Sequence, residues 1–256
     1  MLILIAESKT MRDEREVSSE EYSLHRPQLE TQADRIMNLF SGMQVEEIAG
    51  MTGLSQSLAN RLYQYAYEFP NKQMGNSAIE AFSGVVFKAL EYSSLSSQAQ
   101  KLCEGEVRIV SSLYGWLRPD DIIKNYRLDY KSRLPRNESE EVAGTVFWRK
   151  DVTIRLVNEL KETGNSEILN LMPGDASAYI DWKLVKNFAK VWKCDFNDAV
   201  TGKTPAAGKL KEMRGLLLRQ ILSETVERCE EIKQLTSDDY FCEGTTKYPD
   251  HLQFLC

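Results

Sequence analysis

The sequence predicts a single α+β domain in which helices surround one mixed sheet. Strand-like and helix-like segments alternate along the 256 residues without the steady strand–helix–strand repeat of a doubly wound fold. A chain of this length can bury one sizeable core, and no internal repeat or low-complexity tract divides it. The most linker-like segment, residues 138–144, is only seven residues long. We therefore expect one domain over residues 1–256.

The individual elements follow from the spacing of apolar residues, because continuous apolar runs predict buried strands and a period of about 3.6 residues predicts helices. Strands are expected at residues 2–6, 107–110, 167–171 and 189–196, with a short strand in the tail. Helices are expected at residues 28–41, 145–160, 182–188 and 209–228. Residues 45–67 predict two further helices that are separated at Gly50–Gly53. Residues 93–101 lead into another helix, and residues 76–92 contribute aromatic side chains to the core.

The composition is that of a globular protein, with 42% hydrophobic and 27% charged residues. No apolar run approaches the roughly 18 residues that a membrane helix needs. The apolar start, residues 1–6, is too short for a signal-peptide core and has no basic residues before it. We expect no membrane association and a cytoplasmic location.

The cysteine and histidine content argues against three kinds of chemistry. The five cysteines are scattered and form no Cys-x-x-Cys pair, which disfavours a disulfide framework and a zinc knuckle. Only His25 and His251 could serve in a Ser-His-Asp or Cys-His nucleophile system. We expect no bound metal and no cofactor.

Charge is segregated along the chain, although the net charge is −6. Residues 11–47 and 224–243 are acidic, whereas residues 107–136 and 181–219 are basic. A nucleic-acid ligand requires a positive surface, since phosphate neutralisation supplies most of the non-specific affinity. If the two basic segments meet in space, an acidic protein can still possess a basic cleft.

Residues 45–65 form the first candidate site, two short helices joined by a glycine-containing turn. In a helix-hairpin-helix, the backbone N–H groups around Gly53 and Ser55 would face a phosphate. In a helix-turn-helix, Ser57, Asn60 and Arg61 would approach base edges. An αα-hairpin that covers the sheet is the third reading, and it is favoured by Glu46 and Glu47 before the turn.

Two arginines on irregular backbone form the second candidate. Arg118 lies in Leu113-Tyr-Gly-Trp-Leu-Arg-Pro119, and Arg127 lies in Tyr126-Arg-Leu128. Guanidinium groups bind phosphate or carboxylate through paired donors, which suits an anion site. The alternative is internal pairing of both arginines with Asp120, Asp121 and Asp129.

The third candidate lies at the start of the last predicted helix, where Lys211 and Arg214 are three residues apart and share a helix face. Gly215 follows, although glycine costs about 1 kcal/mol relative to alanine within a helix. A glycine kept there often allows a backbone or a ligand to approach closely. Lys9-Thr10, just after the first predicted strand, is a weaker candidate of the same kind.

Taken together and in order, these segments resemble the YaaA family of peroxide-stress proteins over nearly the whole chain. The resemblance is carried by the motifs Leu2-Ile-Leu-Ile-Ala-Glu-Ser-Lys-Thr10, Leu113-Tyr-Gly-Trp-Leu-Arg-Pro119, Tyr126-Arg-Leu128, Phe147-Trp148, Asn170-Leu171, Asp181-Trp-Lys183 and Lys211-Glu-Met-Arg-Gly215. It implies a helix-hairpin-helix-like element, a basic cleft, DNA binding and a cytoplasmic role in limiting iron-dependent oxidative damage. Two segments depart from the family pattern. Ala6-Glu-Ser-Lys9 replaces Ser-Pro-Ala-Lys, and Met172-Pro-Gly-Asp175 replaces Ala-Ser-x-Glu.

The main hypothesis is a DNA-binding stress protein whose basic cleft contains Lys9, Arg118, Arg127, Lys211 and Arg214. The alternative is an enzyme or binding protein that uses the same cluster for a small phosphorylated or carboxylated ligand. There Asp175 would act as a general base and Lys9 as a clamp, which makes these two the catalytic candidates. Tyr114 and Trp148 are expected to line the site. A third possibility is a purely structural protein in which the arginines are paired internally.

Overall fold

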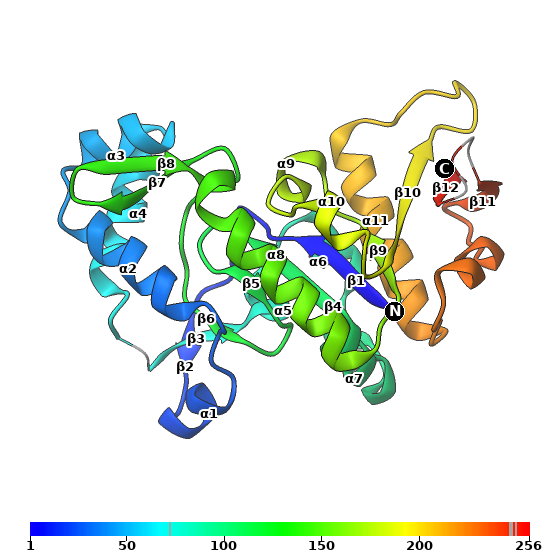
Figure 1. Cartoon of the computed structure of the whole chain (residues 1–256), viewed down its shortest axis with the longest axis horizontal. Helices are drawn as coiled ribbons and strands as arrows, with labels where there is room; N and C mark the ends of the chain where they lie inside the picture. The colour runs from blue at the N-terminus through cyan, green and yellow to red at the C-terminus, as the bar shows by residue number, and fades with distance from the viewer. Residues whose placement is uncertain (72, 246–247, 249) are drawn as a thin grey trace.

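The computed structural model describes residues 1–71, 73–245, 248 and 250–256. Its centre is a seven-stranded sheet with the order β11-β12-β10-β9-β1-β4-β5. These strands are β1 (Leu2–Ala6), β4 (Val107–Ser111), β5 (Gly115–Leu117), β9 (Glu167–Asn170), β10 (Lys190–Asn197), β11 (Phe241–Thr245) and β12 (His251–Leu255). The sheet is mixed and surrounded by helices, which confirms the predicted α+β class (Figure 1).

The five inner strands all run in the same direction. β1 pairs in parallel with β4 on one side and with β9 on the other, and β10 pairs in parallel with β9 and β12. Only the edge strands β5 and β11 are antiparallel to their neighbours. The carboxyl ends of the inner strands therefore meet at one edge of the sheet, where α/β sheets commonly bind ligands.

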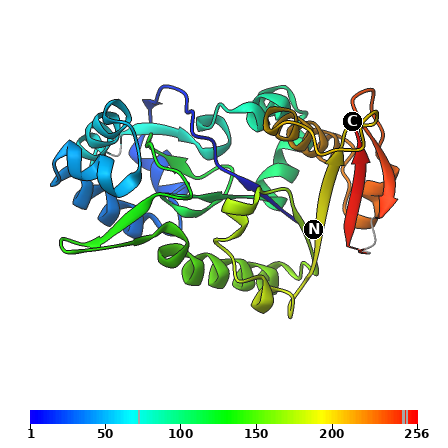
Figure 2. The ribbon, with the colours of Figure 1, turned by 90° about the horizontal axis from the view of Figure 1, so that it is seen from above.

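Helices cover both faces of this sheet (Figure 2). The long helix α8 lies on one face, and α6, α7 and α11 lie on the other. The helices are α1 (Ser19–Leu24), α2 (Glu30–Ser41), α3 (Val45–Thr52), α4 (Gln56–Glu68), α5 (Ala78–Ala81), α6 (Val85–Leu90), α7 (Ser97–Glu106), α8 (Gly144–Thr163), α9 (Gly174–Ser177), α10 (Trp182–Val185) and α11 (Ala207–Ser223), with 3-10 turns η1 (Tyr92–Ser94) and η2 (Cys229–Gln234). The buried apolar side chains form one cluster from Met1 to Phe254.

Most of the left part of the molecule in Figure 1 is built by the long segment of chain between β1 and β4. This part contains α1 to α4 and the small sheet of β2 (Arg15–Glu16), β3 (Met74–Ser77) and β6 (Ile122–Ile123). The ribbon of β7 (Arg133–Asn137) and β8 (Glu140–Ala143) lies against it and contacts α2 and α3. Residues 138–144, the most linker-like segment of the sequence, therefore form the turn and second strand of this ribbon and the start of α8. Their acidic side chains lie on the exposed face of a two-stranded ribbon, and Arg133 and Arg136 each form an ion pair across it, with Glu141 and Glu140.

Gly215 lets α11 approach α6 very closely. A Cβ atom at this position would lie 2.4 Å from the carbonyl oxygen of Val86 and 2.7 Å from Cβ of Ala89. Gly215 was expected to allow a backbone or a ligand to approach closely. The structure shows that the approaching backbone is that of helix α6. This contact also fixes the position of the helix face that carries Lys211 and Arg214.

We expect Gly215→Ala to lower the free energy of unfolding by about 1–3 kcal/mol, because overpacking outweighs the better helix propensity of alanine. Urea denaturation would measure the loss. Gly208→Ala, on the same helix with no atom within 4 Å of its Cβ position, is the matched control and should not destabilise. Equal stability of the two variants would contradict the close contact.

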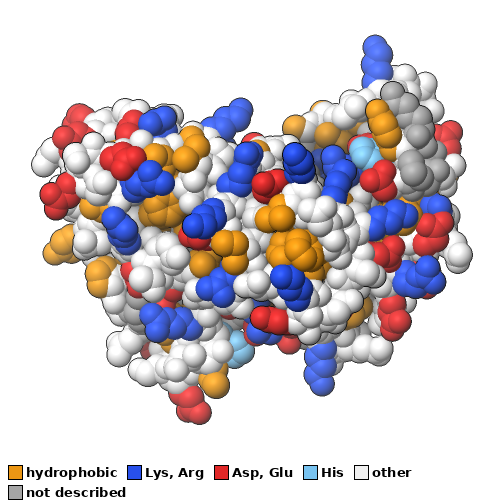
Figure 3. All heavy atoms as spheres, viewed as in Figure 1, with side chains coloured by type: hydrophobic (Ala, Val, Ile, Leu, Met, Phe, Trp, Pro, Cys, Tyr) orange, Lys and Arg blue, Asp and Glu red, His pale blue; other side chains and the backbone are white. Residues whose placement is uncertain are grey.

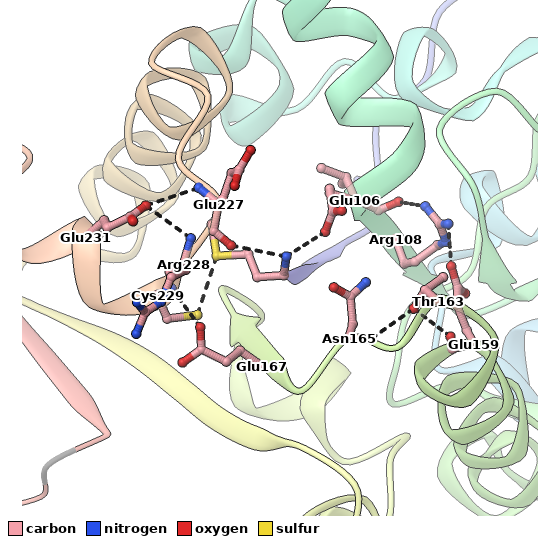
Figure 4. A network of polar contacts seen from close by, with 12 residues as sticks. Glu106, Arg108, Glu159, Thr163, Asn165, Glu167, Glu227, Arg228, Cys229 and Glu231 are labelled. Carbon is pink, nitrogen blue, oxygen red and sulfur yellow. Dashed lines mark hydrogen bonds and ion pairs between the residues drawn. The ribbon is translucent and has the colours of Figure 1, made fainter.

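Buried ion pairs and hydrogen bonds lie at the opposite edge of the sheet, where the inner strands begin (Figure 4). Arg108 pairs with Glu159 of α8 and donates to the carbonyl of Glu104 at 3.0 Å. Glu167 accepts from the backbone N–H of Cys229 at 3.2 Å. Arg108, one of the basic residues of segment 107–136, is therefore neutralised inside the fold and contributes nothing to a cleft.

None of the helices in the described part of the chain is both long and apolar enough to cross a bilayer.

Candidate functional site

A cavity of about 340 Å³ lies at the carboxyl edge of the sheet, beside β1 and β9. It is lined by the end of β1, the start of α6, the segment after β9, the loop at Asp129 and the first part of α11. The lining residues are Ile5, Ala6, Glu7, Ser8, Lys9, Thr10, Gly84, Val85, Val86, Phe87, Asp129, Tyr130, Leu171, Pro173, Asp175, Lys211 and Arg214. The volume lies within the range of small-ligand sites, about 300–1,000 Å³.

The cavity brings together basic residues from distant parts of the chain. Lys9 follows β1, whereas Lys211 and Arg214 lie one helical turn apart on α11. Burial lowers the pKa of Arg214, and the negative charges of Asp175 and Asp195 oppose this effect. An arginine remains a cation in either case. Sequence motifs from both ends of the chain thus converge on one site.

Asp129 lines the cavity, and Arg127 lies beside it in contact with Lys9. Lys9 Nζ lies 2.7 Å from Asp129 Oδ2, and Arg127 Nη1 donates to the carbonyl oxygen of Lys9 at 2.6 Å. Burial opposes ionisation of Asp129, yet the hydrogen bond from Lys9 and the N–H of Lys131 hold its pKa below the ordinary value. One of the two predicted arginines therefore lies at the site, tied to Lys9.

Asp175 is exposed at the first turn of α9 and lines the cavity. Its Oδ1 accepts the N–H of Ala176 at 3.0 Å. The structure thus places both catalytic candidates, Lys9 and Asp175, at the same cavity.

Glu7 also lines the cavity, and the sequence-based reasoning missed it. Its carboxylate accepts from the backbone N–H of Ser112 at 2.8 Å, from Ser112 Oγ at 2.5 Å and from the hydroxyl of Tyr126. Burial raises the pKa of Glu7 to about 7, and these hydrogen bonds act in the opposite direction. A carboxyl group of this kind is poised to gain or lose a proton near neutral pH. The sequence feature that could have indicated Glu7 is its position as a charged residue directly after a buried strand.

Arg118 does not line this cavity. β5 runs back along β4, with Ser111 opposite Gly115 and Ile109 opposite Leu117. Arg118 is therefore carried toward the other edge of the sheet, where its Nε lies 3.4 Å from Asp120 Oδ1. Arg118 is therefore paired within the chain, which was the alternative to an anion site for this motif.

Tyr114 and Trp148 lie in the core, so they do not form the expected aromatic lining. Their exposed fractions are 2% and 0%. Trp148 Nε1 donates to the carbonyl of Ser112 at 2.9 Å, and Tyr114 OH accepts from the N–H of Lys124 at 3.0 Å. Both rings satisfy their polar atoms within the fold, as buried Trp and Tyr usually do.

The conformation and packing of Gly115 explain why a glycine follows Tyr114 in this motif. Gly115 adopts the left-handed conformation, with φ of +69°, and a Cβ there would lie 2.6 Å from the Trp148 ring. The motif therefore builds the tight turn between β4 and β5.

The predicted helical hairpin is present as α3 and α4, joined by residues 53–55. Gly53 ends α3 in the left-handed conformation, and Ser55 caps α4 by accepting from Leu58 N at 3.5 Å. The N–H of Gly53 donates to Ala49, and that of Leu54 donates to Thr52 Oγ1 at 3.3 Å. Two N–H groups that a phosphate-binding hairpin would offer are thus engaged within the chain.

The hairpin and the cavity share a loop. Ser132 Oγ donates to the carbonyl of Thr52 at 3.3 Å and accepts from the N–H of Asp129 at 3.2 Å. Figure 3 shows a hollow at the upper edge of the molecule, between the part that contains α3 and α4 and the part that contains α11, with Lys and Arg side chains around it.

Within the described residues, no group of three or more His, Cys, Asp or Glu side chains is arranged to hold a metal ion. All five cysteines are free thiols.

Comparison with known proteins identifies the family. The family model described as "Peroxide stress protein YaaA" matches residues 1–245. Similar curated proteins are the "UPF0246 protein" of Francisella philomiragia, 27% identical over 94% of each chain, and that of Hahella chejuensis, 29% identical over 94% of this chain and 93% of the relative. The "UPF0246 protein" of Crocosphaera subtropica is 26% identical over the full length of both. The chain belongs to the family of the peroxide stress protein YaaA.

Proposed function

We propose that this protein acts in the cytoplasm during peroxide stress by binding DNA in the cleft at the carboxyl edge of the sheet, and that it thereby limits iron-dependent oxidative damage. The observation that carries the proposal is the convergence of Lys9, Lys211 and Arg214 around one cavity, with Arg127 hydrogen-bonded to Lys9, in a protein of net charge −6. A local cluster of cations attracts phosphates whatever the net charge of the whole molecule.

The position of the α3–α4 hairpin supports the same proposal. Through Ser132 it is tied to the loop that carries Asp129, so a strand of DNA that contacts the cavity would pass close to the hairpin. The exposed side chains Asn60 and Arg61 of α4 are available for further contacts.

Fluorescence anisotropy with labelled duplex, bubbled and single-stranded DNA over a salt series would test the proposal. Lys211→Ala and Arg214→Ala should each weaken binding about tenfold and reduce the magnitude of the slope of log affinity against log salt by about one. Each substitution removes one cation from the site.

Lys101→Ala is the matched control, because Lys101 is an exposed lysine on α7, near the edge of the sheet where β4 begins. It should leave both affinity and slope unchanged. Arg118→Ala should have a smaller effect than Arg214→Ala, since Arg118 pairs with Asp120 away from the cavity. An affinity that does not change with ionic strength would refute the proposal. A failure to bind any of the three DNA forms would refute it as well.

A second candidate function is binding or conversion of a small phosphorylated or carboxylated ligand. It is favoured by the three carboxyl groups that line the cavity, those of Glu7, Asp129 and Asp175. Carboxylates repel a DNA backbone, but they can position a small ligand and exchange protons with it. Saturable binding of a small phosphorylated compound, lost in Arg214→Ala, together with no DNA binding would favour this function.

A further inference from the structure

The hydrogen bonds around Glu7 fix where its proton can reside. Oε2 accepts from the backbone N–H of Ser112 at 2.8 Å and from the hydroxyl of Tyr126. Oε1 accepts from Ser112 Oγ at 2.5 Å. The N–H of Ser112 can only donate, whereas the two hydroxyl groups can in principle either donate or accept.

The direction of the Tyr126 bond is set by its neighbour Ser111. Ser111 Oγ accepts from the N–H groups of Leu113 and Tyr114, at 3.1 and 2.9 Å. These two bonds use both lone pairs of the hydroxyl. The Ser111 hydrogen must then point to the Tyr126 oxygen, 2.8 Å away. Tyr126 consequently donates to Glu7.

Oε2 thus faces two fixed donors and has no room for a proton. Oε1 faces only the Ser112 hydroxyl, which can rotate and accept instead of donating. Burial raises the pKa of both Tyr126 and Tyr130 well above the ordinary value, so neither phenol loses its proton near neutral pH. Oε1 of Glu7 is the one oxygen of this network that can gain a proton without breaking a bond to a fixed donor.

We propose that Glu7 takes up a proton at Oε1 when an anion of phosphate or sulfate type occupies the cavity, so that anion binding is coupled to protonation. The inference rests on the proposed binding of anionic groups at this site. In the free protein, hydrogen bonds from Ser112 and Tyr126 favour the ionised carboxylate, against the effect of burial. An anion bound in the cavity that Glu7 lines repels this carboxylate, and the repulsion favours the protonated form.

The groups that face Glu7 come from every element packed around it. They are Lys9 after β1, Ser111 at the end of β4 and Ser112 after it, Tyr126, Asp129 and Tyr130 of the following loop, Asp175 of α9, and Lys211 and Arg214 of α11, with Tyr179 behind Tyr130. The lining residues of α6, Val85, Val86 and Phe87, are apolar. Neither His25 nor His251 lines the cavity; they contact Asp120 and Asp195.

This coupling makes binding depend on pH in a definite direction. Glu7 of the free protein has a pKa of about 7, and the bound state requires the protonated form. Affinity should therefore fall about tenfold between pH 6 and pH 8. The bound proton is released with the anion.

Isothermal titration with inorganic sulfate, whose charge is constant over this pH range, would test the coupling. Measurements in buffers of different ionisation enthalpy give the number of protons taken up. The wild-type protein should take up close to one proton at pH 8 and almost none at pH 6. The labelled bubbled duplex should show the same pH dependence in anisotropy, since phosphodiesters do not titrate in this range either.

Glu7→Gln is the informative variant. Its amide oxygen can accept from Ser112 N and Tyr126, and its NH₂ group can donate to Ser112 Oγ, as a protonated glutamate would. Its affinity should change less than twofold between pH 6 and pH 8, with no proton uptake. Asp121→Asn removes another buried carboxyl of pKa about 7 that lies outside the cavity, and it should leave the coupling intact.

Infrared difference spectra between wild type and Glu7→Gln provide a readout without a ligand. A protonated carboxyl band that disappears with a midpoint near pH 7 would support the inference, and absence of the band at pH 5 would overturn it. If Glu7→Gln bound the anion with the same pH dependence as the wild-type protein, the coupling would be overturned. The proposed function would not be affected by that result. Failure of the wild-type protein to bind either probe would remove both.

Discussion

Replacement of Trp148 by alanine should lower the free energy of unfolding by about 3–5 kcal/mol, as large-to-small changes of buried aromatic residues do. The ring is fully buried and packs against Gly115 and against Phe147, 4.9 Å away between ring centroids. The substitution also leaves the carbonyl of Ser112 without its indole donor. Urea denaturation monitored by circular dichroism would measure the loss.

Val146→Ala is the matched control, because Val146 lies on the same helix with 61% of its surface exposed. It should change stability by no more than about 0.5 kcal/mol. If Trp148 lined the ligand cavity, its replacement would instead alter binding and leave stability nearly unchanged. That result would contradict the core position of the ring.

The sequence predicted the elements of the central sheet well, because each buries a distinct apolar run. β1, β4, β9 and β10 lie within a residue or two of the expected strands, and α8 matches the expected helix. Helix ends were predicted less well. The last helix was expected to reach residue 228, but α11 ends at Ser223. The apolar periodicity of the sequence continues past Ser223 into the buried residues of η2. The sequence pattern is therefore the same as that of one longer helix.

The β7–β8 ribbon shows a different limit of sequence reasoning. Its two strands carry many charged residues, and three of the four residues of β8 are half-buried rather than buried, so no face of β8 has an apolar signature. Cross-strand pairs such as Arg133 with Glu141 become visible only once the register is known.

The candidate site was predicted in part. Lys9, Lys211 and Arg214 could be grouped from motif order and charge, and they do line one cavity. The error at Arg118 arose because the three-residue step from Gly115 to Arg118 runs back along β5 and carries the side chain about 10 Å from the ligand edge. Glu7 was missed because a single carboxylate after a strand has no special pattern. Its importance comes from the burial and the donors that the fold supplies.

The same burial predicts an unusual dependence of stability on pH. Asp121 is 3% exposed, and burial raises its pKa to about 7, although its carboxylate accepts the N–H of Arg118 at 2.8 Å. Burial likewise raises the pKa of Glu7 to about 7. Between the ordinary values, 3.8 and 4.5, and pH 7, the folded state binds more protons than the unfolded state. The free energy of unfolding must therefore fall as pH rises through this window.

We expect each of the two groups to contribute a decrease of a few kcal/mol between about pH 4.5 and pH 8, at roughly 1.4 kcal/mol per pKa unit. Asp129 acts in the opposite sense, but its lowered pKa confines its effect to more acidic solutions. Urea denaturation at pH 5, 6.5 and 8 would measure the trend. Asp121→Asn keeps an acceptor for Arg118 N and should flatten the curve, whereas Asp238→Asn, at an exposed position, should not. A slope as steep in Asp121→Asn as in the wild-type protein would mean that Asp121 is ionised throughout this range and that the effect comes from Glu7 alone.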